Sequence, residues 1–157
     1  MNPTSNPTPL AVREALIPVL NALLADASVL SATAKQAHWN VRGPLFKPLH
    51  KLFDDVAGEA SGWADTIAER VAALGGTVTG TMAQAVGATR LPTNAPLGHD
   101  ATVCLSAVAE GLARFSKAAR ELQGKAEGDL ATQDVGIEVQ RAADKLLWMC
   151  EASMPGR

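Results

Sequence analysis

The chain has 157 residues, of which 47% are hydrophobic, 4% aromatic and 19% charged, and its formal net charge is −2. This length fits a single domain with its own core, and the abundance of Ala and Leu favours an all-α fold over strands. Basic residues are interleaved with acidic ones, so the sequence lacks the clustered positive charge that is typical of nucleic-acid-binding proteins.

The N-terminal segment, residues 1–9, is polar and rich in proline, and we expect a flexible tail there. Leucines at helical spacing then predict a helix from Leu16 to about residue 37, in which Pro18 introduces a local kink. We find no apolar run that approaches the roughly 18–20 residues of a membrane-spanning helix. We therefore expect a cytoplasmic protein.

A second helix is predicted over residues 48–74, where apolar residues again recur at helical spacing. The turn before it, over residues 40–48, contains glycine and proline, and Pro48 also suits the first turn of the helix. Gly75 and Gly76 end this helix.

The segment 77–98 is rich in Gly, Thr and Pro and contains one short helical candidate, residues 82–86, so we interpret it as a long crossover. A third helix begins near Asp100, and a break over residues 124–129 separates it from a fourth. Four helices with short first and last connections and one long middle connection predict a ferritin-like four-helix bundle over residues 10–155.

The two cysteines, Cys104 and Cys150, lie 46 positions apart, and each falls within a helical pattern of apolar residues. This spacing is not that of a paired metal site. We therefore predict two buried free thiols, in preference to a disulfide or a ligand role.

Side chains that bind metal ions are concentrated around the second helix. His50 with Asp54, and Asp65 with Glu69, are each four positions apart, so each pair projects from one side of the helix and can hold a metal ion. His38 lies at the end of the first helix. Imidazole and carboxylate ligands suit Fe(II), Zn(II) or Mn(II).

The two ligand pairs face away from the predicted core and are about 22 Å apart along the helix, too far to share one metal centre within a chain. An antiparallel contact with a second copy across a two-fold axis near residues 59–60 brings one pair of each chain to the other pair of its partner. Gly58, Ser61 and Gly62 lie at that point and allow two backbones to approach closely. The pattern therefore predicts two identical sites per dimer.

Ordinary roles explain the same residues one at a time. Carboxylates four positions apart on a helix are often solvated or paired with Lys or Arg, and a single histidine is more often structural than a ligand. The combination of five ligand-type residues on a face that closes under two-fold symmetry puts the metal-binding interpretation on an equal footing with these ordinary roles.

The sequence AHWNVRG at residues 37–43, followed by Phe46, His50 and Asp54, resembles the Dps family, the DNA-binding proteins from starved cells that are also called mini-ferritins. The resemblance continues through DTIAER at 65–70 and LGG at 74–76, and it covers most of the chain in length and helix order.

This resemblance implies a bacterial dodecamer, a hollow shell of tetrahedral symmetry that oxidises Fe(II) with hydrogen peroxide in preference to dioxygen and stores the Fe(III) as mineral. Such a protein protects the cell against oxidative stress. All positions of the family's ferroxidase centre, at the dimer interface, are retained as His38, His50, Asp54, Asp65 and Glu69.

Further roles follow from the same resemblance. Trp39 occupies the position of a tryptophan that lies close to the iron in relatives and traps stray radicals, although packing in the core explains it equally well. Glu127, Asp129 and Asp134 lie where relatives have an acidic iron-entry pore, and a solvated turn explains them equally well.

The DNA-binding members of the family carry several Lys or Arg in a flexible N-terminal tail, whereas this chain has no basic residue before Arg13 and ends with a single one, Arg157. DNA binding, which depends on neutralising phosphates, is therefore not expected. The main alternative function is a nucleoid-compacting DNA-binding protein with incidental iron binding. A second alternative is a mononuclear iron oxygenase that uses His38, His50 and Asp54.

Overall fold

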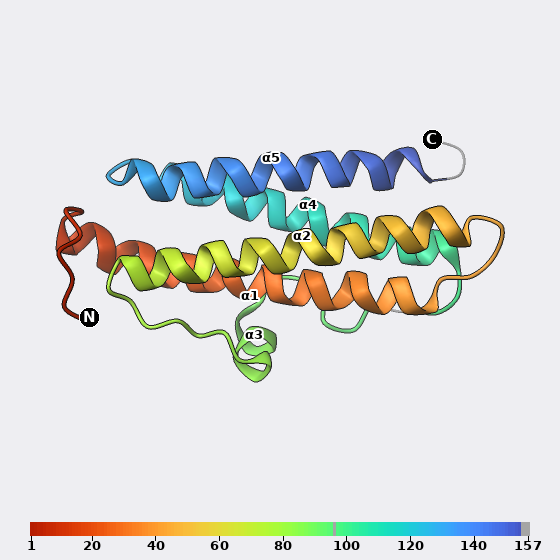
Figure 1. Ribbon diagram of the computed structural model, residues 1–157, viewed down its shortest axis with the longest axis horizontal. Helices are drawn as coiled ribbons and strands as arrows, with labels where there is room; N and C mark the ends of the chain where they lie inside the picture. The colour runs from red at the N-terminus through yellow and green to blue at the C-terminus, as the bar shows by residue number, and fades with distance from the viewer. Residues whose placement is uncertain (96, 155–157) are drawn as a thin grey trace.

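The structure, a computed structural model, describes residues 1–95 and 97–154, and over these residues it contains helices and no strand (Figure 1). The order along the chain is α1 (Leu10–Asn40), α2 (Phe46–Ala73), α3 (Met82–Ala88), α4 (Ala101–Lys125) and α5 (Leu130–Ala152). The predicted all-α, ferritin-like arrangement is confirmed. The end of the predicted domain at residue 155, and the basic residue Arg157, lie outside the described residues.

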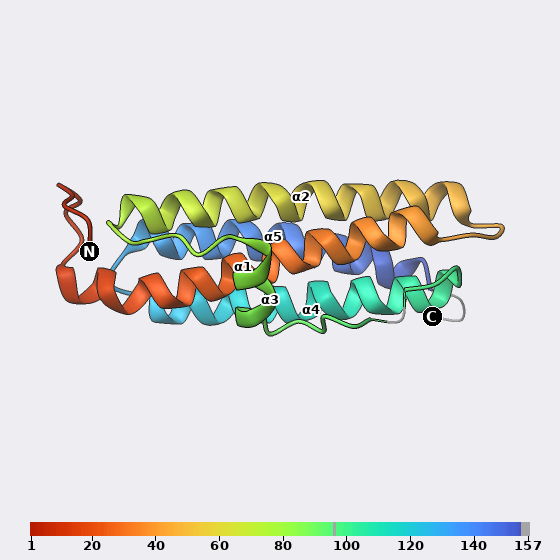
Figure 2. The same cartoon turned by 90° about the horizontal axis from the view of Figure 1, so that it is seen from below.

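The four long helices form two antiparallel hairpins, α1 with α2 and α4 with α5, which pack side by side (Figure 1). Residues 41–45 and 126–129 make the two short connections. The crossover between the hairpins runs along the outside of the bundle, and the short α3 lies against α1 (Figure 2). The connection within each hairpin is therefore short, and the connection between the two hairpins is long, as predicted.

Some helix boundaries differ from the prediction. The first helix begins at Leu10 rather than Leu16, and α4 continues through Gly124 to Lys125 before the chain turns. Pro48 lies in the first turn of α2, where its missing N–H costs no helical hydrogen bond.

The end of α2 is fixed by its two glycines. The Gly75 N–H donates to the Ala72 carbonyl and the Gly76 N–H donates to the Val71 carbonyl, each at 2.9 Å, which is the hydrogen-bond pattern of a Schellman motif. Gly75 has a φ of +79°, and a Cβ atom there would lie 2.7 Å from the Asn2 carbonyl oxygen. Both the backbone conformation and the space therefore require glycine at this position.

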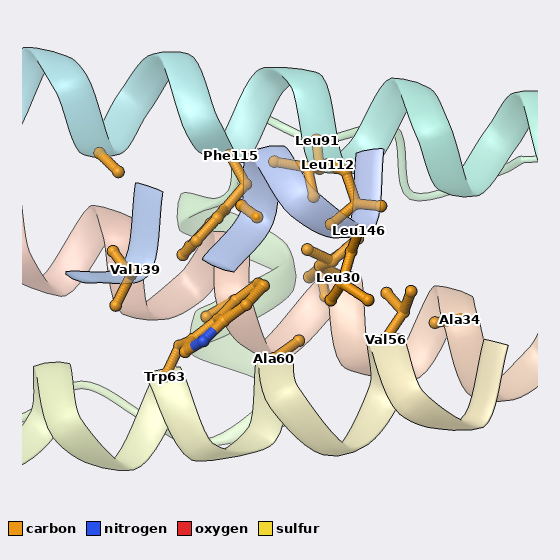
Figure 3. Packing of buried hydrophobic residues seen from close by; sticks show 14 of the residues in the cluster. Leu30, Ala34, Val56, Ala60, Trp63, Leu91, Leu112, Phe115, Val139 and Leu146 are labelled. Carbon is orange, nitrogen blue, oxygen red and sulfur yellow. The ribbon is translucent and has the colours of Figure 1, made fainter. Parts of the chain in front are cut away.

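The core lies along the bundle axis, where all four long helices contribute aliphatic and aromatic side chains (Figure 3). At its centre the Trp63 ring of α2 stacks on the Phe115 ring of α4, with 5.0 Å between ring centroids. Leu30 of α1 packs in the same cluster, and Leu91 from the crossover closes it on one side. The crossover thus contributes to the core as well as linking the hairpins.

The length and composition of α1 are sufficient for a membrane-spanning helix, so the prediction that no apolar run is long enough was wrong. Half of the apolar window of α1 is buried inside the protein, where the helix packs against α2, α4 and α3. The core helix of a soluble protein meets the same criteria of length and composition. We attribute the apolar character of α1 to its place in the core.

The N-terminal segment lies against the end of α2. The Asn2 N–H donates to the Gly75 carbonyl at 2.8 Å, and the Asn6 side chain donates to the Ala73 carbonyl at 3.2 Å. The Arg13 guanidinium donates to the Leu74 carbonyl at 3.2 Å. These contacts define one docked conformation of residues 1–9, and the flexibility of the segment remains a prediction.

Both cysteines are free and buried, as predicted. Burial is the main cause that raises the pKa of each thiol, and for Cys150 the pKa rises to about 12. Neither thiol is therefore ready to form a thiolate near neutral pH.

Candidate metal centre

The two histidines meet where α1 ends and α2 begins. The His38 Nδ1–H donates to the His50 carbonyl oxygen at 2.7 Å, and the His50 Nδ1–H donates to the His38 carbonyl oxygen at 2.9 Å. The two rings stack with 3.7 Å between their centroids. Because a carbonyl only accepts, both Nδ1 atoms must carry hydrogen, which leaves Nε2 of each neutral ring with a free lone pair. This is the tautomer that a metal-binding histidine needs.

Asp54 extends this pair along α2, one turn after His50. Its Oδ1 atom lies 4.0 Å from His38 Nδ1 and accepts a 2.5 Å hydrogen bond from Lys35 Nζ on α1. The hydrogen bond from Lys35 is the main cause that lowers the pKa of Asp54; partial burial opposes it, and neighbouring His38 and His50 lower it further. The Asp54 side chain is 47% exposed, so it remains accessible as a ligand.

The second predicted pair, Asp65 and Glu69, is exposed on the far part of the same helix. Over the described residues, no three His, Cys, Asp or Glu side chains of one chain are close enough together to hold a metal ion. The structure thus brings His38, His50 and Asp54 to one end of α2 and leaves Asp65 and Glu69 apart from them. The alternative of a mononuclear oxygenase uses the three residues at that end of α2 and stays an untested prediction.

The surface between the two ligand groups is open. Gly58, Ser61 and Gly62 are exposed, and a Cβ atom added at either glycine would meet nothing within 4 Å outside its own helix. A groove of about 480 Å³ between α2 and α5 extends from Asp54 past Gly58. This face of α2 therefore has room for a second chain, and the two-fold contact stays a prediction.

The aromatic residues near the histidines are placed differently from one another. The Phe46 ring lies 4.9 Å from the His50 ring, centroid to centroid, and shields it on one side. Trp39 is 63% exposed, so the alternative that it packs in the core of its own chain is wrong. Its role as a radical trap stays a prediction.

The three acidic residues at the α4–α5 junction also have different surroundings. Glu127 and Asp134 are exposed, whereas Asp129 is 7% exposed. The Asp129 carboxylate pairs with Arg70 and accepts a 2.6 Å hydrogen bond from the Thr132 hydroxyl. Burial alone would raise the pKa of Asp129, but the hydrogen bonds from Thr132 and Arg70 outweigh burial and lower it. Asp129 is therefore a paired structural charge in this chain, and the prediction of an acidic pore rests on Glu127 and Asp134.

Two features of this region were missed in the sequence. The backbone carbonyls that orient the histidines have no sequence signal. Lys35 did have a sequence signal, because it lies three positions before His38 and so projects from the same side of α1. A charged residue one turn from a candidate ligand is a reason to look for competition or pairing at that ligand.

Comparison with known proteins identifies the family of the chain. A family model described as a ferritin-like domain matches residues 17–154. The DNA protection during starvation protein of Agrobacterium fabrum is 35% identical over 95% of this chain and 93% of its own, and that of Brevibacillus brevis is 33% identical over 90% and 96%. The structure of Dps from Microbacterium arborescens in its high iron form has a TM-score of 0.85 at 30% identity, covering 95% of this chain and 96% of the other. Because these matches span nearly the whole of each protein, the chain belongs to the Dps family of ferritin-like proteins.

Proposed function

We propose that this protein is a ferroxidase that oxidises Fe(II) at sites shared between two subunits, with hydrogen peroxide as the preferred oxidant, and stores the Fe(III) as mineral in a hollow homo-oligomer. The observation that carries the proposal is the reciprocal hydrogen bonding of His38 and His50, which leaves both Nε2 atoms free, together with an Asp54 carboxylate oxygen that lies 4.0 Å from His38 Nδ1. A histidine whose other nitrogen is fixed by a carbonyl is prepared to bind a metal ion.

The proposed site is completed by the partner chain. His38, His50 and Asp54 of one chain face Asp65 and Glu69 of the other across the two-fold axis near residues 59–60. This gives each site two imidazoles and three carboxylates, a donor set suited to Fe(II). Two identical sites form per dimer, and further association of dimers into a shell of twelve subunits follows the family pattern.

The chemistry removes both ingredients of hydroxyl-radical formation. Two Fe(II) ions in one site give one electron each to hydrogen peroxide, whose O–O bond breaks as both oxygens are reduced to the level of water. No single-electron product is released. In this proposal Trp39, exposed beside His38, intercepts stray oxidising equivalents, and Glu127 and Asp134 attract Fe(II) to the entry pore.

The names of the relatives refer to iron in one case and to the protection of DNA in the others. The Microbacterium arborescens structure is described as a high iron form, and the curated relatives are named for protecting DNA during starvation. Removing Fe(II) and peroxide protects DNA without binding it. We accordingly propose a cytoplasmic protein that acts on iron and peroxide rather than on DNA directly.

Complementation between two inactive variants tests the shared site. One variant changes His38, His50 and Asp54 to Ala, and the other changes Asp65 and Glu69 to Ala. Each homo-oligomer should oxidise Fe(II) no faster than a protein-free control. After dissociation and random reassembly, about half of the dimers are mixed and each has one intact site of two, so about a quarter of the wild-type centres should return. Fe(II) oxidation followed by absorbance measures the recovery.

The outcome has a clear interpretation. Mass measurement must first establish that mixed dimers have formed. Mixed dimers that recover no activity would show that the metal is held within one chain. The same assay compares oxidants: wild-type protein should oxidise Fe(II) faster with peroxide than with air, and equal rates would contradict the proposed oxidant.

A further inference from the structure

A groove of about 480 Å³ lies between α2 and α5, and Asp54, one of the proposed iron ligands, lines it. Its α2 wall runs from Asp54 to Glu59, and its α5 wall runs from Ala142 to Met149. The two helices run in opposite directions (Figure 1), so Met149 lies at the same end of the groove as Asp54. A molecule that leaves the proposed site along this groove therefore passes the Met149 thioether.

Met149 is the sulfur side chain best placed to meet an oxidant in this groove. The chain has four methionines, and Met149 is the one that lines the groove beginning at Asp54. Met149 is 36% exposed, whereas Met82 on α3 is 68% exposed and lines a different hollow, beside α1. Cys150, the next residue after Met149, is buried. Position therefore favours oxidation of Met149, whereas exposure alone favours oxidation of Met82.

We propose that Met149 is an oxidation site, at which surplus hydrogen peroxide is reduced once the Fe(II) in the shared site has been used up. This inference rests on the proposed function. Cations held in the site polarise the peroxide, and the sulfur of Met149 supplies the electrons that the iron no longer has. A sulfur lone pair forms a bond to one peroxide oxygen, the O–O bond breaks, and the other oxygen leaves as water with both protons. The sulfur loses two electrons and the peroxide gains two, so the product is methionine sulfoxide.

The position of Met149 allows this change without loss of the fold. A sulfoxide is polar and disrupts a core in which it is buried. Met149 instead lies on the partly exposed wall of a groove, where water solvates the new oxygen. Because reductases return methionine sulfoxide to methionine, the side chain can be used again. Each subunit therefore carries one renewable reductant at the groove that begins at Asp54.

The test is a titration with hydrogen peroxide of the assembled protein, loaded with Fe(II) in the absence of air. Mass spectrometry of peptides then measures the sulfoxide at each methionine. With peroxide alone, oxidation should follow exposure, so Met149 should be oxidised about half as fast as Met82. With iron, and beyond the amount of peroxide that Fe(II) consumes, Met149 should be oxidised faster than Met82, so the ratio of their rates should rise at least about twofold. Peroxide labelled with heavy oxygen should pass its label to the Met149 sulfoxide, whereas oxygen taken from water would overturn the proposed step.

Two substitutions by leucine, which keeps the volume and apolar character of methionine, extend the test. Met149→Leu should oxidise Fe(II) at the wild-type rate, because Met149 is not a proposed ligand. After the Fe(II) is exhausted, wild-type protein should rapidly remove about one further molecule of peroxide per subunit, and Met149→Leu should lack this removal. Met82→Leu is the matched control and should behave as wild type. Equal removal by wild type and Met149→Leu would refute the proposal.

A further variant separates this inference from the proposed function. Asp65→Ala with Glu69→Ala removes the partner's half of the site, so it should lose Fe(II) oxidation and also the preference for Met149 over Met82. If Fe(II) oxidation persists, the shared site itself is wrong. If Fe(II) oxidation is lost but iron-loaded wild-type protein never oxidises Met149 ahead of Met82, the shared site stands and the role of Met149 is refuted. The same role is refuted if the variant keeps the preference for Met149, since oxidation is then independent of the site.

Discussion

Arg70 and Asp129 form an ion pair that ties the last turn of α2 to the start of α5, with side chains only 15% and 6% exposed. Removing one partner leaves a buried charge without compensation. We expect Asp129→Asn to reduce the free energy of unfolding at neutral pH by about 3 kcal/mol. Glu110→Gln, which breaks the exposed pair with Arg114, should cost less than about 1 kcal/mol. Urea unfolding at a fixed subunit concentration measures both.

The same pair makes stability depend on pH in a defined direction. The pKa of Asp129 is lower in the folded protein than its ordinary value of 3.8. Its stabilising effect is therefore fully present above pH 3.8 and is lost as the pH falls through the lower folded-state pKa. The difference in unfolding free energy between wild type and Asp129→Asn should be constant near neutral pH and shrink below pH 3.8. A difference that grows in acid would contradict this assignment.

The buried thiols are protected from the oxidant that we propose the protein uses. Thiolate is the reactive form of cysteine, and with a pKa of about 12 Cys150 is ionised in only about one molecule in ten thousand at pH 8. A colorimetric disulfide reagent should therefore label Cys104 and Cys150 very slowly in the native protein and rapidly in urea. Fast native labelling of both would show that the helices open around them.

At the level of helices, α2 carries both ligand groups and the surface between them. Replacing an exposed Gly in a helix with Leu stabilises the isolated helix by up to about 1 kcal/mol, so Gly62→Leu should leave the fold intact. It should nevertheless block the proposed two-fold contact, because the added side chain fills the space that a second α2 needs. We expect a helical monomer by circular dichroism and native mass spectrometry, without rapid Fe(II) oxidation.

Gly124→Leu is the matched control, because Gly124 is also exposed in a helix with open surroundings but lies on α4. It should keep the dimer and its activity. Retention of dimers by Gly62→Leu would place the contact on another surface.

Sequence periodicity predicted α2 closely because its apolar stripe is regular and its end is marked by Gly75 and Gly76. The start of α1 was missed because residues 10–15 have little apolar periodicity. For the candidate site, spacing identified the side chains that share a helical face. Spacing did not reveal the ion pair of Lys35 with Asp54 or that of Arg70 with Asp129, because each joins residues that are far apart in the chain.

For the molecule as a whole, the distribution of positive charge argues against DNA as a direct partner. The first basic residue, Arg13, is already bonded to the backbone carbonyls of Thr8 and Leu74. DNA affinity rises with the number of phosphates neutralised, and the N-terminal segment neutralises none. We expect duplex DNA to migrate unchanged in a gel with the assembled protein at neutral pH and roughly physiological salt. A clear shift without added metal would instead support the nucleoid-compacting function.

The order of the hairpins along the chain has a consequence for biosynthesis. All five proposed ligands lie between residues 38 and 69, on the α1–α2 hairpin, whereas α4 and α5 supply none. A ribosome completes this hairpin before it begins the second one, and contacts that are local in sequence form first. A nascent chain thus exposes His38 beside His50, and the surface of α2 that we propose for the two-fold contact, before α4 and α5 complete its core. Pairing with another subunit and folding of the second hairpin then compete for the same unfinished molecule.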